Sequence, residues 1–406
     1  MSDIKIINDP VFGFIKIPRG LILNVICHPL MQRLTRIRQL GMASVVYPGA
    51  QHTRFLHSIG AFHLVSEALL SLQQMGVFIF ESEGEAVQIA ILLHDIGHGP
   101  FSHVLENSLI SGISHEDISL LMMEKMNREM DGMLTLAIKI FKDEYPKRFL
   151  HQLISSQLDM DRLDYLRRDS FFTGVSEGNI GSARIIKMLD VENDALVVDQ
   201  KGIYSIENYL ISRRLMYWQV YLHKTAVGCE AILVNLLKRA KHLVRKGHQL
   251  FASPALAYFL VNDVDRAFFD SHQEALQNYC ALDDNDIWSS VKVWMNDTDP
   301  VLSMLATDLV DRRIFKVEVF DKPIPEEVIA ERLAQICQHS GLSTDDATYL
   351  MSANTVNKKM YSMEDDHITI KCKDGTCKDI SQASELFDVT RLSMKNSKYY
   401  LCYQRF

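Results

Sequence analysis

The sequence predicts a mainly helical protein with short β-hairpins and a small C-terminal α+β unit. Apolar residues recur at helical spacing over most of residues 21–311. Short alternating runs surround turn residues near residues 4–14 and 196–204, and alternation returns after residue 312. We therefore expect a helical domain with a helical extension over residues 1–311, followed by an α+β domain over residues 312–406.

The first elements follow from the turn and break residues. Alternating runs at residues 4–6 and 12–14 flank Asn8-Asp9-Pro10, which predicts a hairpin. A second hairpin is expected over residues 196–204, with Gly202 in its turn. Helices are expected over residues 61–75, 85–94, 115–126, 147–158 and 206–244, with further amphipathic helices up to residue 311.

The last part of the chain changes character. Strands are expected over residues 314–320, 367–371 and 399–403, and a helix over residues 325–339. No chemical motif falls in this region. A structural, regulatory or oligomerising role is therefore expected for it.

Composition limits the class of protein. Hydrophobic residues make up 47% and charged residues 23% of the 406 residues, as in ordinary globular proteins, and the net charge of −8 makes nucleic acid an unlikely partner. Seven scattered cysteines fit a reducing compartment, and Cys372 and Cys377 lack the further ligands of a zinc site. Neither a run of about 18 apolar residues nor a signal-peptide core is found, so we expect a cytoplasmic protein without a membrane partner.

The segment from Leu93 to His103 carries the most chemistry. It holds the adjacent pair His94-Asp95 and two further histidines, His98 and His103. Imidazole and carboxylate are the side chains that bind hydrolytic divalent metals.

Two further polar residues complete a plausible metal site. His57 lies upstream and Asp161 downstream, each within a largely apolar stretch. Together with His94 and Asp95 they provide two nitrogen and two carboxylate ligands, which leave positions open for water and substrate. We expect one divalent ion, which could be Mn, Fe, Mg, Ni or Zn.

A structural alternative exists for each residue. A single histidine such as His94 is more often packed in a core than bound to a metal, and Asp95 could only cap a helix end before Gly97. However, burying an unpaired histidine and aspartate among apolar residues costs free energy. The metal site is therefore the preferred interpretation.

These motifs resemble those of a known family. Residues 47–50 (Tyr-Pro-Gly-Ala), 54–58 (Arg-Phe-Leu-His-Ser), 94–103 and 159–165 resemble, in order and spacing, the HD-domain phosphohydrolases. The branch that hydrolyses deoxynucleoside triphosphates is the most similar. The resemblance covers roughly residues 20–240 and implies that residues 1–311 hold an HD-type helical bundle with the catalytic site.

The resemblance also implies roles for individual residues. His57, His94, Asp95 and Asp161 match the metal ligands. His115 matches the histidine that donates a proton to the leaving oxygen. Glu106 matches the carboxylate that orients this histidine. His98 and His103 match histidines near the α-phosphate.

Contacts to the substrate are implied in the same way. Arg54, Arg162 and Arg213 match residues that bind phosphate; Tyr165, Asp169 and Tyr221 match contacts to the sugar and base; Gln39 and Leu40 match residues beside the deoxyribose. Simple helix packing is an alternative for Tyr221. A solvated helix face is an alternative for Arg33, Arg36 and Arg38.

One departure from the family pattern concerns regulation. Regulated members have an acidic residue, which reads an activating guanine nucleotide, where this chain has Cys27. A thiol cannot pair with the guanine edge as a carboxylate does. An allosteric nucleotide is possible, but the match does not extend to guanine specificity.

The functional expectation is a metal-dependent hydrolase that converts dNTPs to deoxynucleoside and inorganic triphosphate. One alternative is an HD-domain nucleotidase or phosphodiesterase acting on mono- or cyclic nucleotides. Another is a nucleotide-binding sensor without turnover. The resemblance also implies a homo-oligomer, a dimer or tetramer.

Overall fold

The computed structural model describes residues 4–101, 103–358, 367–384 and 396–405. The fold is mainly helical, as predicted. The N-terminal hairpin is confirmed: β1 (Ile4–Asp9) pairs antiparallel with β2 (Gly13–Pro18), and Ile7 lies opposite Ile15. Ile15 and Ile17 are buried, so one face of β2 packs on the core.

A bundle of helices follows the hairpin. The helices are α1 (Leu21–Cys27), α2 (Pro29–Arg33), α3 (Arg54–Gln74), α4 (Glu81–Leu93), α5 (His103–Glu106), α6 (His115–Glu129), α7 (Thr135–Phe141), α8 (Arg148–Gln152), α9 (Met160–Thr173) and α10 (Ser182–Lys187). Helix α3 packs against α4 and α9 in the centre of the bundle. The predicted helix over residues 147–158 is helical only at α8 and then turns into α9.

The second hairpin lies earlier than predicted. Strands β3 (Leu189–Glu192) and β4 (Ala195–Asp199) are joined by Asn193 and Asp194, both with positive φ (52° and 59°). Two adjacent residues in this conformation make the tight turn that hairpins favour, and Asn and Asp tolerate it. Gly202 instead lies in a short 3₁₀ turn before the next helix.

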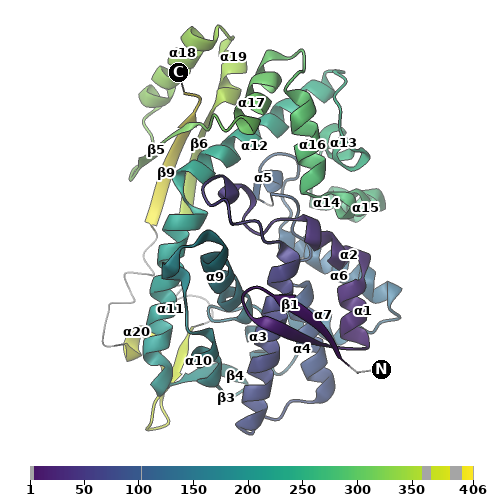
Figure 1. Ribbon diagram of the computed structural model, residues 1–406, viewed down its shortest axis with the longest axis vertical. Coiled ribbons are helices and arrows are strands. Elements are labelled where there is room, and N and C mark those ends of the chain that lie inside the picture. Colours follow the sequence, from purple (N-terminus) through teal and green to yellow (C-terminus); the bar gives the residue numbers. More distant parts are fainter. Residues whose placement is uncertain (1–3, 102, 359–366, 385–395, 406) are drawn as a thin grey trace.

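The predicted helix over residues 206–244 is interrupted. Helix α11 (Ile203–Met216) passes into a π-helical turn at Tyr217–Tyr221, and α12 (Lys224–Arg245) follows after a bend of 52°. Helix α12 runs through the middle of the molecule and contacts the C-terminal sheet, α13 (Pro254–Val261) and α17 (Pro300–Val310) (Figure 1). Between these two helices the chain forms α14 (Arg266–Ser271), α15 (Gln273–Ala281) and α16 (Asp284–Trp294).

The C-terminal residues do not form one separate α+β unit as predicted. β5 (Lys316–Phe320), β9 (Asn396–Tyr403) and β6 (Met351–Lys358) form one antiparallel sheet, with α18 (Glu326–Ser340) and α19 (Thr344–Ala347) between β5 and β6 in the chain. β7 (Thr369–Lys371) and β8 (Cys377–Asp379) instead join β3 and β4, because β7 pairs parallel with β4. With α20 (Ile380–Ala383), they lie at the opposite end of the molecule (Figure 1).

One helix has the length and composition of a membrane span. An 18-residue window of α3 has a mean hydropathy of 1.3, although polar residues interrupt its apolar run. The neighbouring helices bury 61% of this window. Most of the window is therefore buried against protein, as in a core helix, although Leu70 is 50% exposed.

Candidate metal centre and active site

Three helix ends bring the predicted metal ligands together. His57 lies in the first turn of α3, His94 and Asp95 directly follow α4, and Asp161 lies in the first turn of α9. The Asp161 Oδ1 atom is 3.0 Å from His57 Nε2 and 3.3 Å from His94 Nε2, and the two Nε2 atoms are 3.4 Å apart. Asp95 carboxylate oxygens lie 3.5 Å from His94 Nε2 and 3.8 Å from His57 Nε2.

The other nitrogen of each histidine ring is occupied. The Nδ1 of His57 is 2.7 Å from Asp164 Oδ2, and that of His94 is 2.7 Å from the carbonyl oxygen of Ile91. Such bonds fix the ring orientation of metal-binding histidines. Both Nε2 atoms consequently face the two carboxylates. The donor atoms of His57, His94 and Asp161 lie close enough together to hold a divalent cation, and the Asp95 carboxylate lies beside them.

The ligands attract one another electrostatically. Burial lowers the pKa of His57, but hydrogen bonds with Asp161 and Asp164 outweigh it and raise the pKa to about 10. For Asp161, burial raises the pKa, but the two histidines together hold it well below its usual range. These shifts favour a protonated His57 beside an ionised Asp161 in the metal-free protein, so a cation would compete with the proton of the His57 ring.

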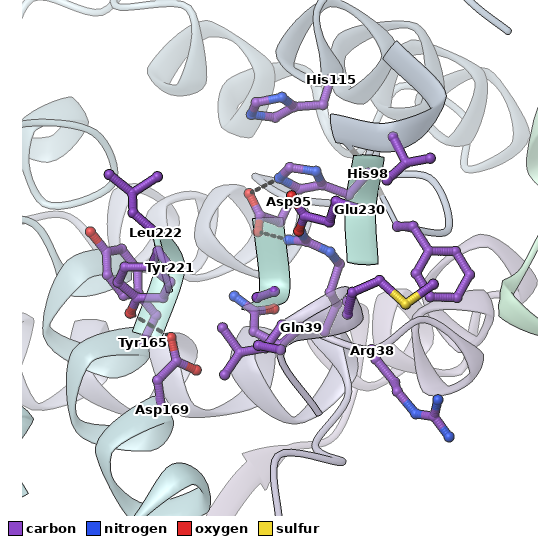
Figure 2. Close-up of a pocket in the computed structure, with 18 of the residues that line it drawn as sticks. Arg38, Gln39, Asp95, His98, His115, Tyr165, Asp169, Tyr221, Leu222 and Glu230 are labelled. Carbon is purple, nitrogen blue, oxygen red and sulfur yellow. Dashed lines mark hydrogen bonds and ion pairs between the residues drawn. The ribbon is translucent and has the colours of Figure 1, made fainter. Parts of the chain in front are cut away.

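A pair of stacked histidines lies beside the ligands. The rings of His98 and His115 have centroids 3.9 Å apart, and His98 Nε2 is 3.4 Å from Asp95 Oδ1 (Figure 2). Glu106 Oε1 is 3.4 Å from His115 Nδ1, as expected for a carboxylate that orients this ring. Of the predicted catalytic histidines, His103 begins α5, and its side chain lies outside the described part of the chain.

A second polar cluster lies across the cavity. The Tyr221 hydroxyl donates to Asp169 Oδ2 at 2.6 Å, and the Tyr165 and Tyr221 rings meet edge to face at 6.1 Å (Figure 2). The other oxygen of Asp169 is 2.7 Å from His52 Nε2. His52 was not identified from the sequence. It is fully enclosed next to Phe172, and only its position just before the start of α3 marks it.

The predicted phosphate contacts differ in their surroundings. Arg54 Nη1 donates to Asp95 Oδ2 at 2.8 Å, so it braces a metal ligand. Arg162 forms an ion pair with Asp159, but its buried Nε has no partner among the described residues. The Nε and Nη1 atoms of Arg213 are also buried without a partner among the described residues. Arg213 does not line the cavity itself.

The cavity in front of the metal ligands has a volume of about 960 Å³. Besides His94, Asp95, Asp161 and the tyrosines, its wall includes Gln39 and Leu40. It also includes Glu230 and Lys238 of α12 and Ser352, Asn354 and Thr355 of β6, which carry no sequence motif. The C-terminal sheet thus forms part of the wall.

The three arginines for which a solvated helix face was an alternative are not equivalent. Arg33 is buried, and its Nη1 donates to the carbonyl of His98 at 2.8 Å, so that alternative does not apply to this residue. Arg36 pairs with Asp283 at 2.5 Å. Arg38 lines the cavity and points away from Asp95 (Figure 2).

The loop after Asp95 is held from several sides. The Tyr279 hydroxyl donates to the Gly97 carbonyl at 2.8 Å, and the amide of Gly97 donates to Ser119 Oγ at 2.9 Å. A Cβ at residue 97 would collide with the His115 carbonyl, so only glycine allows α6 to approach this closely. Ser119 in turn donates to the His94 carbonyl at 2.8 Å, which ties the loop to the end of α4.

Comparison with known proteins agrees with this geometry. Residues 54–169 match the HD domain, and residues 180–250 match the HD associated region. A phosphohydrolase crystal structure from Bacteroides thetaiotaomicron superposes with a TM-score of 0.96, at 62% identity, over 99% of this chain and 100% of that chain.

Two sequence relatives extend the comparison. YwfO, an uncharacterised protein of Bacillus subtilis, is 30% identical over 402 residues, which cover 96% of this chain and 89% of that protein. The deoxynucleoside triphosphate triphosphohydrolase SAMHD1 of Bos taurus is 25% identical over 92% of this chain and 70% of that protein. The chain carries the HD motif, and its helical fold brings the residues of that motif together. The chain belongs to the HD-domain phosphohydrolase family.

Proposed function

We propose that this protein hydrolyses dNTPs to deoxynucleoside and inorganic triphosphate. The observation that carries the proposal is the set of buried guanidinium nitrogens on Arg162 and Arg213 that lack a partner among the described residues. A relative named as a dNTP triphosphohydrolase supports it.

An unpaired buried polar group costs roughly 1–3 kcal/mol, and more when it is charged. Arg162 lines the cavity, so its unpaired nitrogen is best explained by an anionic ligand. Arg213 does not line the cavity itself, and its unpaired nitrogens would be met only by a ligand that extends beyond the cavity wall. A triphosphate is longer than a single phosphate, and we propose that it extends from the metal centre towards both arginines.

The residues of the site can be assigned steps of the reaction. His57, His94, Asp95 and Asp161 would hold a divalent ion, which when bound would supply positive charge for a phosphoryl oxygen and make water more acidic. Water adds to the α-phosphorus, and the bond to the 5′ oxygen breaks with its electron pair on that oxygen. His115, held by Glu106, gives that oxygen its proton, and the proton lost by the water passes to solvent.

Tyr165, Tyr221 and Asp169 face the same cavity and offer aromatic and polar contacts for a nucleoside. His52 fixes Asp169, so the carboxylate is presented in one orientation. We propose that these residues hold the sugar and base while the arginines hold the phosphates.

Product analysis tests the proposal. The full chain is incubated with Mn²⁺ and each dNTP, rNTP, dNMP and cyclic nucleotide, and the products are separated by chromatography. Deoxynucleoside and triphosphate in equal amounts are expected from dNTPs. Release of only orthophosphate or pyrophosphate, or turnover of only mono- or cyclic nucleotides, would overturn the proposal. Nucleotide binding with no turnover would favour a sensor.

Variants separate the substrate classes further. Arg162→Ala and Arg213→Ala are expected to raise the KM for a triphosphate at least about tenfold, because each removes a charged hydrogen bond worth about 1.5–3 kcal/mol. The effect on a monophosphate should be much smaller. Asp143→Asn is a matched control, because Asp143 lies in a surface loop after α7 and pairs only loosely with Arg148 at 3.8 Å.

We also propose that the protein assembles into a homo-oligomer. Tyr204, Ile211 and Leu215 are 69%, 43% and 37% exposed, and their spacing places them on one face of α11. An exposed apolar stripe of this kind supports helix docking. Light scattering of the wild type and of Ile211→Lys tests it, and a wild-type monomer would contradict it.

We also propose that Cys27 does not select the guanine base of an activating nucleotide. This thiol is exposed at the end of α1. Equal effects of purine and pyrimidine nucleotides on the initial rate are expected, and activation by GTP alone would refute the statement.

A further inference from the structure

A chain of buried charges leads away from the metal centre. His57 Nδ1 lies 2.7 Å from Asp164 Oδ2, and Asp164 receives two further hydrogen bonds from Arg168, Nε and a terminal nitrogen, each at 2.9 Å. All three side chains are fully enclosed. A two-pronged contact of this kind fixes the plane of the carboxylate.

The chain of charges continues into the N-terminal hairpin. The remaining terminal nitrogen of Arg168 donates to Asp9 Oδ2 at 2.8 Å, and Asp9 is 1% exposed. Arg168 thus lies between two carboxylates, and every nitrogen of its guanidinium has an acceptor. Because Asp9 shares the positive charge, Asp164 keeps more negative charge for the His57 ring than it would in a simple pair.

The hairpin turn holds Asp9 rigidly. Its other oxygen, Oδ1, accepts from the amides of Val11 at 2.8 Å and Phe12 at 2.9 Å. The Phe12 ring also packs against the Arg168 guanidinium, 5.7 Å from its centroid. The same turn therefore fixes Arg168 by charge and by ring contact.

The spacing of two ligand-bearing helices depends on this network. Gly60 lies one turn after His57 on α3, and a Cβ there would collide with Asp164 Oδ1 and with Arg168. Helix α9 carries Asp164, Arg168 and the ligand Asp161. Any shift of Arg168 would therefore move His57 and Asp161 relative to each other.

We propose that Asp9 is a positioning residue of the metal centre, acting through Arg168 and Asp164 on His57. It lies 45 residues before the segment that matches the HD domain, so that segment alone lacks the outer end of the network. The proposal concerns cation affinity and is independent of which phosphate ester is hydrolysed.

Asp9→Asn is the most informative change. Its amide oxygen can still accept from Val11 and Phe12, but its NH₂ group faces Arg168 as a second donor. The hairpin turn is therefore kept while the charge is lost. Asp9→Ser is a second variant, because a serine hydroxyl supports the same kind of turn without reaching Arg168.

The metal-free full chain is titrated with Mn²⁺ by calorimetry, and its Tm is measured with and without Mn²⁺. Loss of residues that orient metal ligands typically costs 10–100-fold in affinity, so a Kd at least about tenfold weaker is expected for both variants. The Mn²⁺-induced rise in Tm should shrink accordingly. Asp143→Asn, the exposed aspartate control, should bind as the wild type does.

The outcomes are distinct. A lower Tm in the metal-free variants with an unchanged Mn²⁺ Kd would mean that Asp9 only stabilises the fold, and would overturn the proposal. If Asp9→Asn does not fold, the result for Asp9→Ser decides in the same way. An activity that falls at low Mn²⁺ and returns at saturating Mn²⁺ supports it, whereas a loss that Mn²⁺ does not restore contradicts it.

Discussion

The imidazole rings of His98 and His115 stack at 3.9 Å with 15° between their planes, yet the two rings differ in proton affinity. Burial and the neighbouring charge of Arg54 lower the pKa of His98 to about 3. Burial also lowers that of His115, but the Glu106 hydrogen bond and the charge of Asp95 outweigh it and raise the pKa. Environments that separate the pKa values of two neighbouring titratable groups are typical of sites where one group acts as a general acid. Here His115 fits that role.

Replacement of His115 by Asn should remove the proton donor. The kcat for the best substrate is expected to fall roughly 10²–10⁴-fold, with a small change in KM, because general acid catalysis contributes about this much. Steady-state kinetics at saturating Mn²⁺ provides the measurement. An unchanged kcat in a folded variant would exclude His115 as the donor.

Replacement of Glu106 by Gln should alter the pH profile. The carboxylate raises the pKa of His115, so its removal lowers that pKa. The protonated, active form is lost as pH rises through the pKa, and the basic limb of kcat should therefore move to lower pH. Glu124→Gln, an exposed change on the helix that carries His115, should leave the basic limb where it is.

Cation binding should release a proton. The pKa of His57 is raised to about 10, so the ring is protonated near pH 7 in the metal-free protein, and it must lose that proton to bind a metal. The apparent Mn²⁺ affinity is expected to rise about tenfold per pH unit for one proton released. Calorimetry in buffers of different ionisation enthalpy counts the protons, and a pH-independent affinity would contradict the assignment.

Replacement of Tyr279 by Phe should weaken the loop that carries Asp95 and His98. The hydroxyl is the donor to the Gly97 carbonyl, and a buried carbonyl left unpaired costs about 1–3 kcal/mol. We expect the free energy of unfolding to fall by this amount and kcat to fall severalfold. Denaturant unfolding and steady-state kinetics provide the measurements, and a free energy of unfolding equal to that of the wild type would contradict the role of this hydroxyl.

The residues of the candidate metal centre can be picked out from the sequence because they form local signals. His57 and His94 are polar residues in largely apolar helical segments, and Asp161 lies in a motif that resembles that of a known family. The supporting residues are not marked in this way. Tyr279 and Gly97 are 182 positions apart, and Arg168 and Asp9 are 159 apart, so only the folded chain brings each pair together.

The fold likewise has features that local sequence predicts and features that depend on contacts between distant residues. Periodicity predicts most helices, since one apolar face repeats every turn. It does not choose a strand's partner, and the sequence therefore predicts β7 with the C-terminal strands although it pairs with β4. The sequence also leaves open whether Arg33 is solvated, because only the folded chain brings the carbonyl acceptor of His98 to its guanidinium.

The parallel pairing of β4 with β7 determines where the chain can be truncated. A fragment that ends at residue 311 would lack β7 and leave the backbone groups of Val198 and Asp199 without their strand partners. Unpaired strand edges are templates for association with other chains. Truncation at the domain boundary that the sequence predicts would thus expose an unpaired strand edge that promotes aggregation. A soluble catalytic fragment therefore requires the C-terminal strands.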